Sequence, residues 1–81
     1  MNINVKVFPI ADICDSTQEF YETLTEGHLS ELMELLRHRY NTNLTEKAIM
    51  ILHNGKSLDL AEDPKLENND QLWIMPVLSS G

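Results

Sequence analysis

The chain has 81 residues, 42% of them hydrophobic, and 13 acidic against 6 basic side chains give a formal net charge of -7 at pH 7. This length suits one domain with one compact core, and no apolar run approaches the ~20 residues of a membrane helix. The acidic balance argues against nucleic acid and anionic membranes and for a basic protein partner, while the same charge also keeps a small domain dispersed.

Cysteine content and the N-terminal sequence both bear on the compartment. A single cysteine, Cys14, can form neither an internal disulfide nor a multi-cysteine metal site, which fits a reducing compartment. The N-terminal residues show no basic, apolar and small-residue regions in series, so we expect no secretory signal. The expected location is therefore the cytoplasm.

The N-terminal third predicts a hairpin. Residues 2–8 read NINVKVF and alternate polar with apolar side chains, which is typical of a half-buried strand. Residues 17–25 read TQEFYETLT, a short segment rich in aromatic and β-branched residues, which favours a second strand. Pro9 ends the regular pairing of the first strand, so the connector 9–16 lies between the two.

An amphipathic helix follows the hairpin. We expect it to begin with a cap at Thr25 or in the Gly27 region and to stop at Asn41 and Asn43. One apolar stripe at helical spacing runs along it and needs a sheet to cover, namely Leu29, Leu32, Met33, Leu36 and Tyr40.

The C-terminal half predicts three more strands. Asn54-Gly55 is a strong hairpin signal between two flanking strands, because both turn positions tolerate positive φ. After a polar loop, residues 71–77 read QLWIMPV, with Leu72 and Ile74 on one side and Trp73 and Met75 on the other. The order predicts an α+β roll whose first and last strands lie side by side as a parallel pair.

This order and spacing resemble the β-grasp (ubiquitin-like) fold and, more narrowly, the MoaD/ThiS sulfur-carrier family, with closest similarity to the small subunit of molybdopterin synthase. The resemblance implies a mixed sheet of four to five strands packed on one main helix, with residues 1–76 as the domain and 77–81 as a mobile C-terminal tail. It rests on VKVF (5–8), LSELMELLRHRY (29–40), ILHNGKSLD (51–59), L-x-x-x-D-x-L-W-I-M-P-V (66–77) and the final glycine.

The resemblance also implies a chemistry for the tail. In such carriers a ubiquitin-activating-type enzyme uses ATP to adenylate the terminal carboxylate, and a sulfur donor converts the adenylate to a thiocarboxylate. Gly81 would carry that group toward molybdopterin or a tungsten-type cofactor, with no cofactor bound by the chain itself. Family members typically end in two glycines, whereas Ser80 precedes Gly81 here.

The implied partners are the adenylating enzyme and the large subunit of molybdopterin synthase or another sulfur acceptor enzyme. The thiazole, cysteine and tRNA routes use the same fold, so the final acceptor depends on proteins encoded elsewhere. The residues expected to contact partners are Phe8 and Met75 on the sheet and Val77, Leu78, Ser79 and Ser80 in the tail.

Several residues have two interpretations. Trp73 either packs in the core or, if exposed with Phe8 and Met75, extends a protein-binding patch on the sheet face opposite the helix. Val77 either starts an apolar plug with Leu78 or finishes the last strand. The alternative function is a non-covalent ubiquitin-like interaction module with no activated C-terminus.

Catalytic motifs do not emerge from the sequence. There is no base paired with a nucleophile in an identifiable motif and no glycine-rich phosphate loop, so we expect a carrier or small subunit rather than an enzyme. His28, His38 and His53 lack a recognisable ligand spacing and are expected to be solvated.

Overall fold

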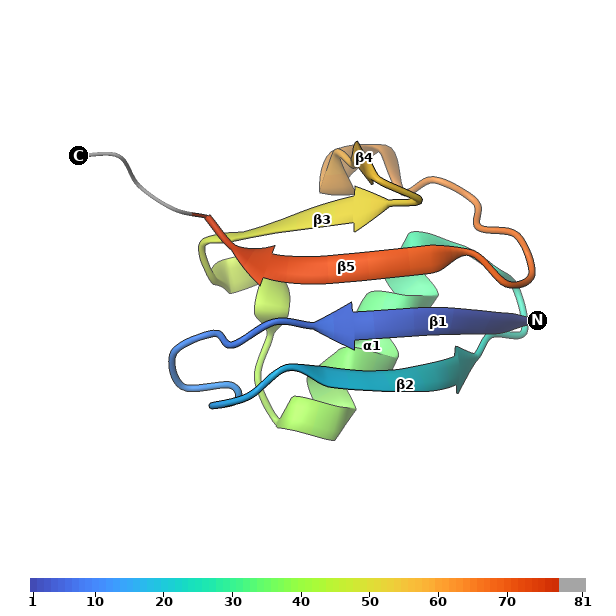
Figure 1. Ribbon diagram of the computed structural model, residues 1–81. Coiled ribbons are helices and arrows are strands. Elements are labelled where there is room, and N and C mark those ends of the chain that lie inside the picture. Colours follow the sequence, from blue (N-terminus) through green and yellow to red (C-terminus); the bar gives the residue numbers. More distant parts are fainter. Residues whose placement is uncertain (78–81) are drawn as a thin grey trace.

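The computed structural model describes residues 1–77, and for Leu60 only the backbone. It forms one mixed sheet with the strand order β2-β1-β5-β3-β4, covered by one helix (Figure 1). The elements are β1 (Asn2–Val7), β2 (Gln18–Thr23), α1 (Leu29–Tyr40), the 3-10 turn η1 (Leu44–Glu46), β3 (Ile49–His53), β4 (Lys56–Ser57), the 3-10 turn η2 (Leu60–Glu62) and β5 (Gln71–Pro76). The predicted α+β roll is confirmed.

The first and last strands form the centre of the sheet. β1 and β5 run parallel, with Asn4 opposite Gln71 and Val7 opposite Ile74. β2 flanks β1 and β3 flanks β5, both antiparallel, so the two central strands have neighbours on either side. The predicted parallel pair is therefore confirmed, and β5 ends at the same end of the sheet as the β1–β2 connection (Figure 1).

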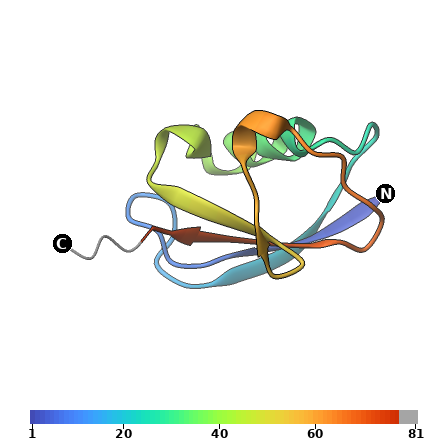
Figure 2. The same cartoon turned by 90° about the horizontal axis from the view of Figure 1, so that it is seen from above.

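The core lies between the sheet and α1. Alternate residues of β1 and β5 turn their side chains inward, and the apolar stripe of α1 packs on them. α1 and both 3-10 turns lie on one side of the sheet, and no described element covers the other side (Figure 2). The fully buried members include Ile3, Val5, Val7, Leu29, Leu32, Leu36, Leu72 and Ile74.

The start of α1 differs from the prediction. The N-cap is His28, whose side chain makes no capping hydrogen bond, and Thr25 lies upstream in the preceding loop. The Glu31 carboxylate instead reaches back and accepts hydrogen bonds from the backbone N–H groups of Thr25, Glu26 and Gly27 at 2.7–2.9 Å. These bonds, with that from the Thr25 N–H the strongest, lower the pKa of Glu31 to about 2.

Two further helix donors are satisfied from a distant segment. The Ser30 N–H donates to Asp63 Oδ1 at 2.7 Å, and the Leu29 N–H donates to the Pro64 carbonyl at 3.0 Å. A helix leaves its first N–H groups without intrahelical partners, so these contacts cap α1 from the segment after η2. Long-range pairing of this kind has no local sequence signature, so the sequence did not predict it. Of the two predicted cap positions, Thr25 is wrong, whereas the observed N-cap directly follows Gly27.

The predicted end of the helix and the predicted hairpin turn are confirmed. Asn41 is the C-cap with φ 53°, a left-handed conformation that asparagine tolerates. Asn54 and Gly55 both have positive φ, 50° and 89°, as the two-residue turn between β3 and β4 requires.

Asp70, directly before β5, ties the β3–β4 turn to the start of that strand. Its carboxylate accepts hydrogen bonds from the Glu67 N–H at 2.8 Å and from Asn54 Nδ2 at 3.1 Å. His53 Nε2 lies 2.6 Å from Asp70 Oδ2 and donates to it, because an ionised carboxylate only accepts. Asn54 Oδ1 in turn accepts the Gln71 N–H at 2.8 Å. We call this group the Asp70 latch.

The latch affects the pKa of Asp70 and the exposure of His53. Burial by itself raises the pKa of the Asp70 carboxyl, but the hydrogen bonds from Glu67, His53 and Asn54 outweigh burial and hold that pKa below its usual value. The prediction that His53 is solvated is wrong, because its side chain is 25% exposed and paired with Asp70. The latch therefore fixes where the central strand β5 begins.

Replacing Asp70 with asparagine tests the latch. A carboxyl whose folded pKa is lowered stabilises the fold above its unfolded pKa, and this contribution disappears as the pH falls through the folded pKa. We expect Asp70→Asn to lower the free energy of unfolding by about 1–3 kcal/mol at pH 7 and to have a smaller effect near pH 3. Urea unfolding at both pH values measures this.

Asp15→Asn is the matched control, because it removes the same charge at a residue that is exposed. We expect it to leave the free energy of unfolding nearly unchanged. An equal loss in the two variants, or a loss in Asp70→Asn that does not shrink at low pH, would contradict the assigned role of Asp70.

Candidate functional site

The face of the sheet away from α1 carries an apolar surface. Residues directly opposite each other on paired strands share a face, and the pairs Met50 with Met75 and Leu52 with Trp73 both point away from the buried side. Phe8 joins them through its ring contact with Trp73. We call Phe8, Met50, Leu52, Trp73 and Met75 the sheet patch.

The aromatic part of the patch has a defined geometry. The ring centroids of Phe8 and Trp73 lie 5.7 Å apart at an interplanar angle of 66°, an edge-to-face arrangement. Trp73 is 37% exposed, and the other patch members are half-buried. Of the two interpretations of Trp73, the structure shows the exposed one, in which the tryptophan, Phe8 and Met75 lie on one open face.

Val77 extends this surface beyond the end of β5. Its N–H donates to the Ala48 carbonyl at 2.9 Å, so the backbone continues the pairing with the β3 side past Pro76. Its side chain is 48% exposed. The chain therefore leaves the sheet next to the patch, while the predicted tail residues Leu78, Ser79, Ser80 and Gly81 lie outside the described residues.

Sequence reasoning missed part of this surface. Met50 and Leu52 occur in an apolar run from 48 to 52, and strict alternation along β3 would have placed them opposite Met75 and Trp73. Lys6 is one of the polar residues that alternate with apolar ones in the segment 2–8, yet its Nζ lies 5.3 Å and 5.4 Å from the centroids of the Phe8 and Trp73 rings. The signal that could have found it is the i, i+2 spacing of Lys6 and Phe8.

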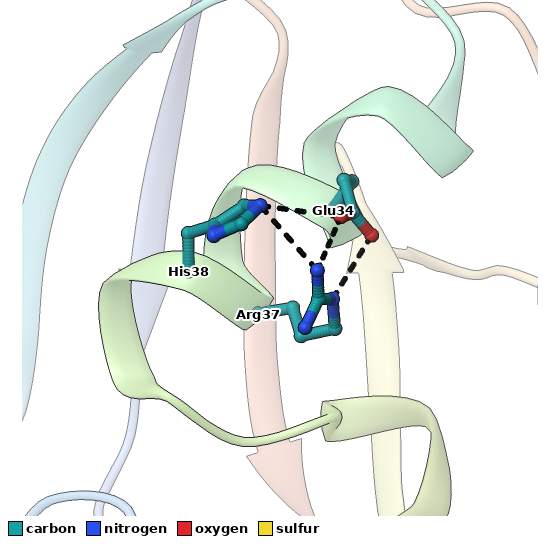
Figure 3. Close-up of polar contacts among 3 residues, drawn as sticks. All are labelled: Glu34, Arg37 and His38. Atoms are coloured by element: carbon teal, nitrogen blue, oxygen red, sulfur yellow. Dashed lines mark hydrogen bonds and ion pairs between the residues drawn. The ribbon is translucent and has the colours of Figure 1, made fainter.

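The opposite surface, on α1, holds a cleft of about 310 Å³ with Leu29 and Met33 among its lining residues. Three side chains next to it are shown in Figure 3, where Arg37 makes two hydrogen bonds to Glu34 and His38 lies beside both. The hydrogen bond from Arg37 is the main cause that lowers the pKa of Glu34. The polar lining groups of the cleft pair with one another: Glu34 with Arg37, Ser30 with Asp63, and Asn43 with Thr45.

The remaining reactive side chains are dispersed. His38 is 68% exposed, as predicted, whereas His28 is half-buried and its Nδ1 has no hydrogen-bond partner in the described part of the chain. Cys14 is half-buried, with Sγ 3.6 Å from the Phe8 carbonyl oxygen. Within residues 1–77 no three histidine, cysteine, aspartate or glutamate side chains gather where they could hold a metal ion.

Among the residues that the structure describes, no helix has both the length and the apolar character needed to cross a bilayer.

Neighbouring residues of β5 separate core from surface. We expect Leu72→Ala to lower the free energy of unfolding by about 2–5 kcal/mol, because Leu72 is fully buried, and Trp73→Ala to lower it by no more than about half as much. Chemical denaturation of the two variants measures this. If removal of Trp73 is as costly as removal of Leu72, the tryptophan is a core residue and the patch is not a free surface.

Comparison with known proteins places the chain. No family model matches it. It is 32% identical over 66 residues to the molybdopterin synthase sulfur carrier subunit of Anopheles gambiae. The aligned residues make up 80% of this chain and 72% of that protein.

Two solved structures share the fold. A protein of Pyrococcus furiosus assigned as molybdopterin converting factor subunit 1 superposes with a TM-score of 0.72 at 21% identity, over 95% of this chain and 98% of that one. SAMP1 of Haloferax volcanii superposes with a TM-score of 0.70 at 18% identity over the full length of both chains. The fold is thus the ubiquitin-like β-grasp that the sequence pattern predicts. On this sequence similarity and this fold, the chain belongs to the MoaD-like family of molybdopterin synthase sulfur carrier subunits.

Proposed function

We propose that this protein is a sulfur carrier for molybdopterin or a tungsten-type cofactor, with the Gly81 carboxylate as the group that carries the sulfur. The sequence similarity to a sulfur carrier subunit supports the carrier role. The observation that carries the structural part is the continuity of the sheet patch with Val77, where the chain leaves the central strand β5.

The proposed chemistry follows from the terminal carboxylate. At neutral pH this group is anionic, with an ordinary pKa of ~3.5, and hydroxide is too poor a leaving group for sulfur to displace directly. In the proposed sequence a ubiquitin-activating-type enzyme positions ATP, a carboxylate oxygen attacks the α-phosphorus, and pyrophosphate leaves. Hydrosulfide from a sulfur donor then attacks the acyl carbon, AMP leaves, and loss of the proton on sulfur gives the thiocarboxylate.

A carrier of this kind needs its C-terminal segment to leave the folded domain at a fixed position relative to the surface that binds the partner. Backbone pairing holds β5 between β1 and β3, so the exit point of the chain at Val77 is fixed relative to the sheet patch. A partner docked on the patch therefore meets the chain at a constant position. Glycine suits the reacting position because it has no Cβ beside the acyl carbon.

The same surface serves the two proposed partners in turn. The adenylating enzyme binds the unmodified protein, and the large subunit of molybdopterin synthase, or another acceptor enzyme, binds the thiocarboxylate form. Aromatic and methionine side chains are common in the centres of protein interfaces, and the sheet patch consists of both types together with Leu52. ATP is bound by the adenylating enzyme in this proposal, and this chain binds no cofactor of its own.

Intact mass measurement tests the proposal. We expect the protein purified from its native host to contain a species in which one sulfur replaces one oxygen, and the host's adenylating enzyme to release pyrophosphate when given ATP and this protein. Ser80→Gly restores the terminal glycine pair of the family, and we expect it to raise the rate of adenylation. Removal of Gly81 serves as the control and should abolish it.

Two results together would contradict the proposal: no thiocarboxylate species in protein from the host, and no ATP-dependent adenylation of either the wild type or Ser80→Gly. The same results would favour a non-covalent ubiquitin-like interaction module, because the sheet patch does not depend on an activated C-terminus.

A further inference from the structure

Lys6 stands out on the open face of the sheet. Of the basic residues, Arg37 and Arg39 are on α1, Lys47 and Lys65 are in loops, and Lys56 lies opposite His53, on the helix side. Among the residues of the described strands, Lys6 is therefore the single basic side chain on the face that carries the sheet patch.

The position of the Lys6 ammonium group is defined by the two aromatic rings. Nζ lies 5.3 Å from the centroid of Phe8 and 5.4 Å from that of Trp73, within the range of a cation–π interaction. Glu19 lies directly opposite Lys6 on β2, where a cross-strand ion pair would be expected, yet no ion pair joins the two. Lys6 thus points its charge over the patch rather than toward the edge of the sheet.

Covering the patch necessarily covers this ammonium group. A partner that contacts the Phe8 and Trp73 rings removes water from Nζ, and a buried ammonium group is destabilising unless an acceptor replaces the lost water. Hydrogen bonds to an ionised acceptor are roughly twice as strong as those between neutral groups. A carboxylate of the partner, placed over the two rings, fits this position best.

We propose that Lys6 is a recognition residue of the sheet patch, and that the protein which docks there presents a carboxylate to its Nζ between the Phe8 and Trp73 rings. This proposal is opposite to the expectation from net charge, which favours a basic partner. The chain is acidic overall, but the proposed docking face binds an acidic group of the partner. The inference rests on the proposed function in taking the adenylating enzyme as the partner.

Charge variants of the full-length protein test this. Calorimetry without ATP measures the affinity for the host's adenylating enzyme, so the readout does not depend on the chemistry at Gly81. We expect Lys6→Glu to weaken binding by about tenfold or more and Lys6→Met, which keeps the aliphatic stem, to weaken it less. Thermal unfolding of each variant verifies that it is folded.

Lys56→Glu is the matched control, because it changes the net charge equally but lies on the side of the sheet away from the patch. We expect it to change the affinity by less than about twofold. Equal weakening by Lys6→Glu and Lys56→Glu, unchanged binding of Lys6→Glu, or no binding of the wild type would each overturn the inference. Binding that depends on Lys6 without subsequent adenylation would instead overturn the sulfur-carrier proposal and retain the role of Lys6.

Discussion

The parallel pairing of β1 with β5 is the constraint on which the rest of the structure depends. It brings the two ends of the chain's folded part together in the centre of the sheet, with Asn4 opposite Gln71 and Val7 opposite Ile74. The inward residues of both strands pack against α1. On the other side of the sheet, β5 contributes Trp73 and Met75 to the sheet patch, Phe8 follows directly after β1, and Met50 and Leu52 come from β3. Core and candidate site are therefore two sides of one sheet with β1 and β5 at its centre.

Local patterns predicted the elements because each pattern reports on its own segment. Alternation identified β1 and β5, helical spacing identified the apolar stripe of α1, and Asn54-Gly55 identified the turn between β3 and β4. Contacts between distant segments escaped prediction. The cap of α1 from Asp63 and the pairing of His53 with Asp70 join residues that are 33 and 17 positions apart.

The candidate site likewise has residues that the sequence predicts and others, such as Lys6, that it does not. Phe8, Trp73 and Met75 could be placed on one face because they alternate with buried neighbours, and the structure confirms that this face is open. The i, i+2 spacing of Lys6 and Phe8 puts these two side chains on one face, but the contact of Lys6 with the Trp73 ring depends on the register between β1 and β5 and could not be predicted. Our proposal departs from the expectation based on net charge, because it rests on the position of one lysine beside two aromatic rings and not on the total charge of the chain.

Mapping the contact surface on the folded protein tests the central claim most directly. The claim is that partners dock on the open face of the sheet and receive the chain where it leaves β5. In a titration of isotope-labelled protein with the host's adenylating enzyme, amide resonances of Lys6, Trp73 and Val77 should shift or broaden while those of Glu34 and Arg37 on α1 stay unchanged. Changes confined to α1 and its cleft, with the open face unaffected, would contradict the account.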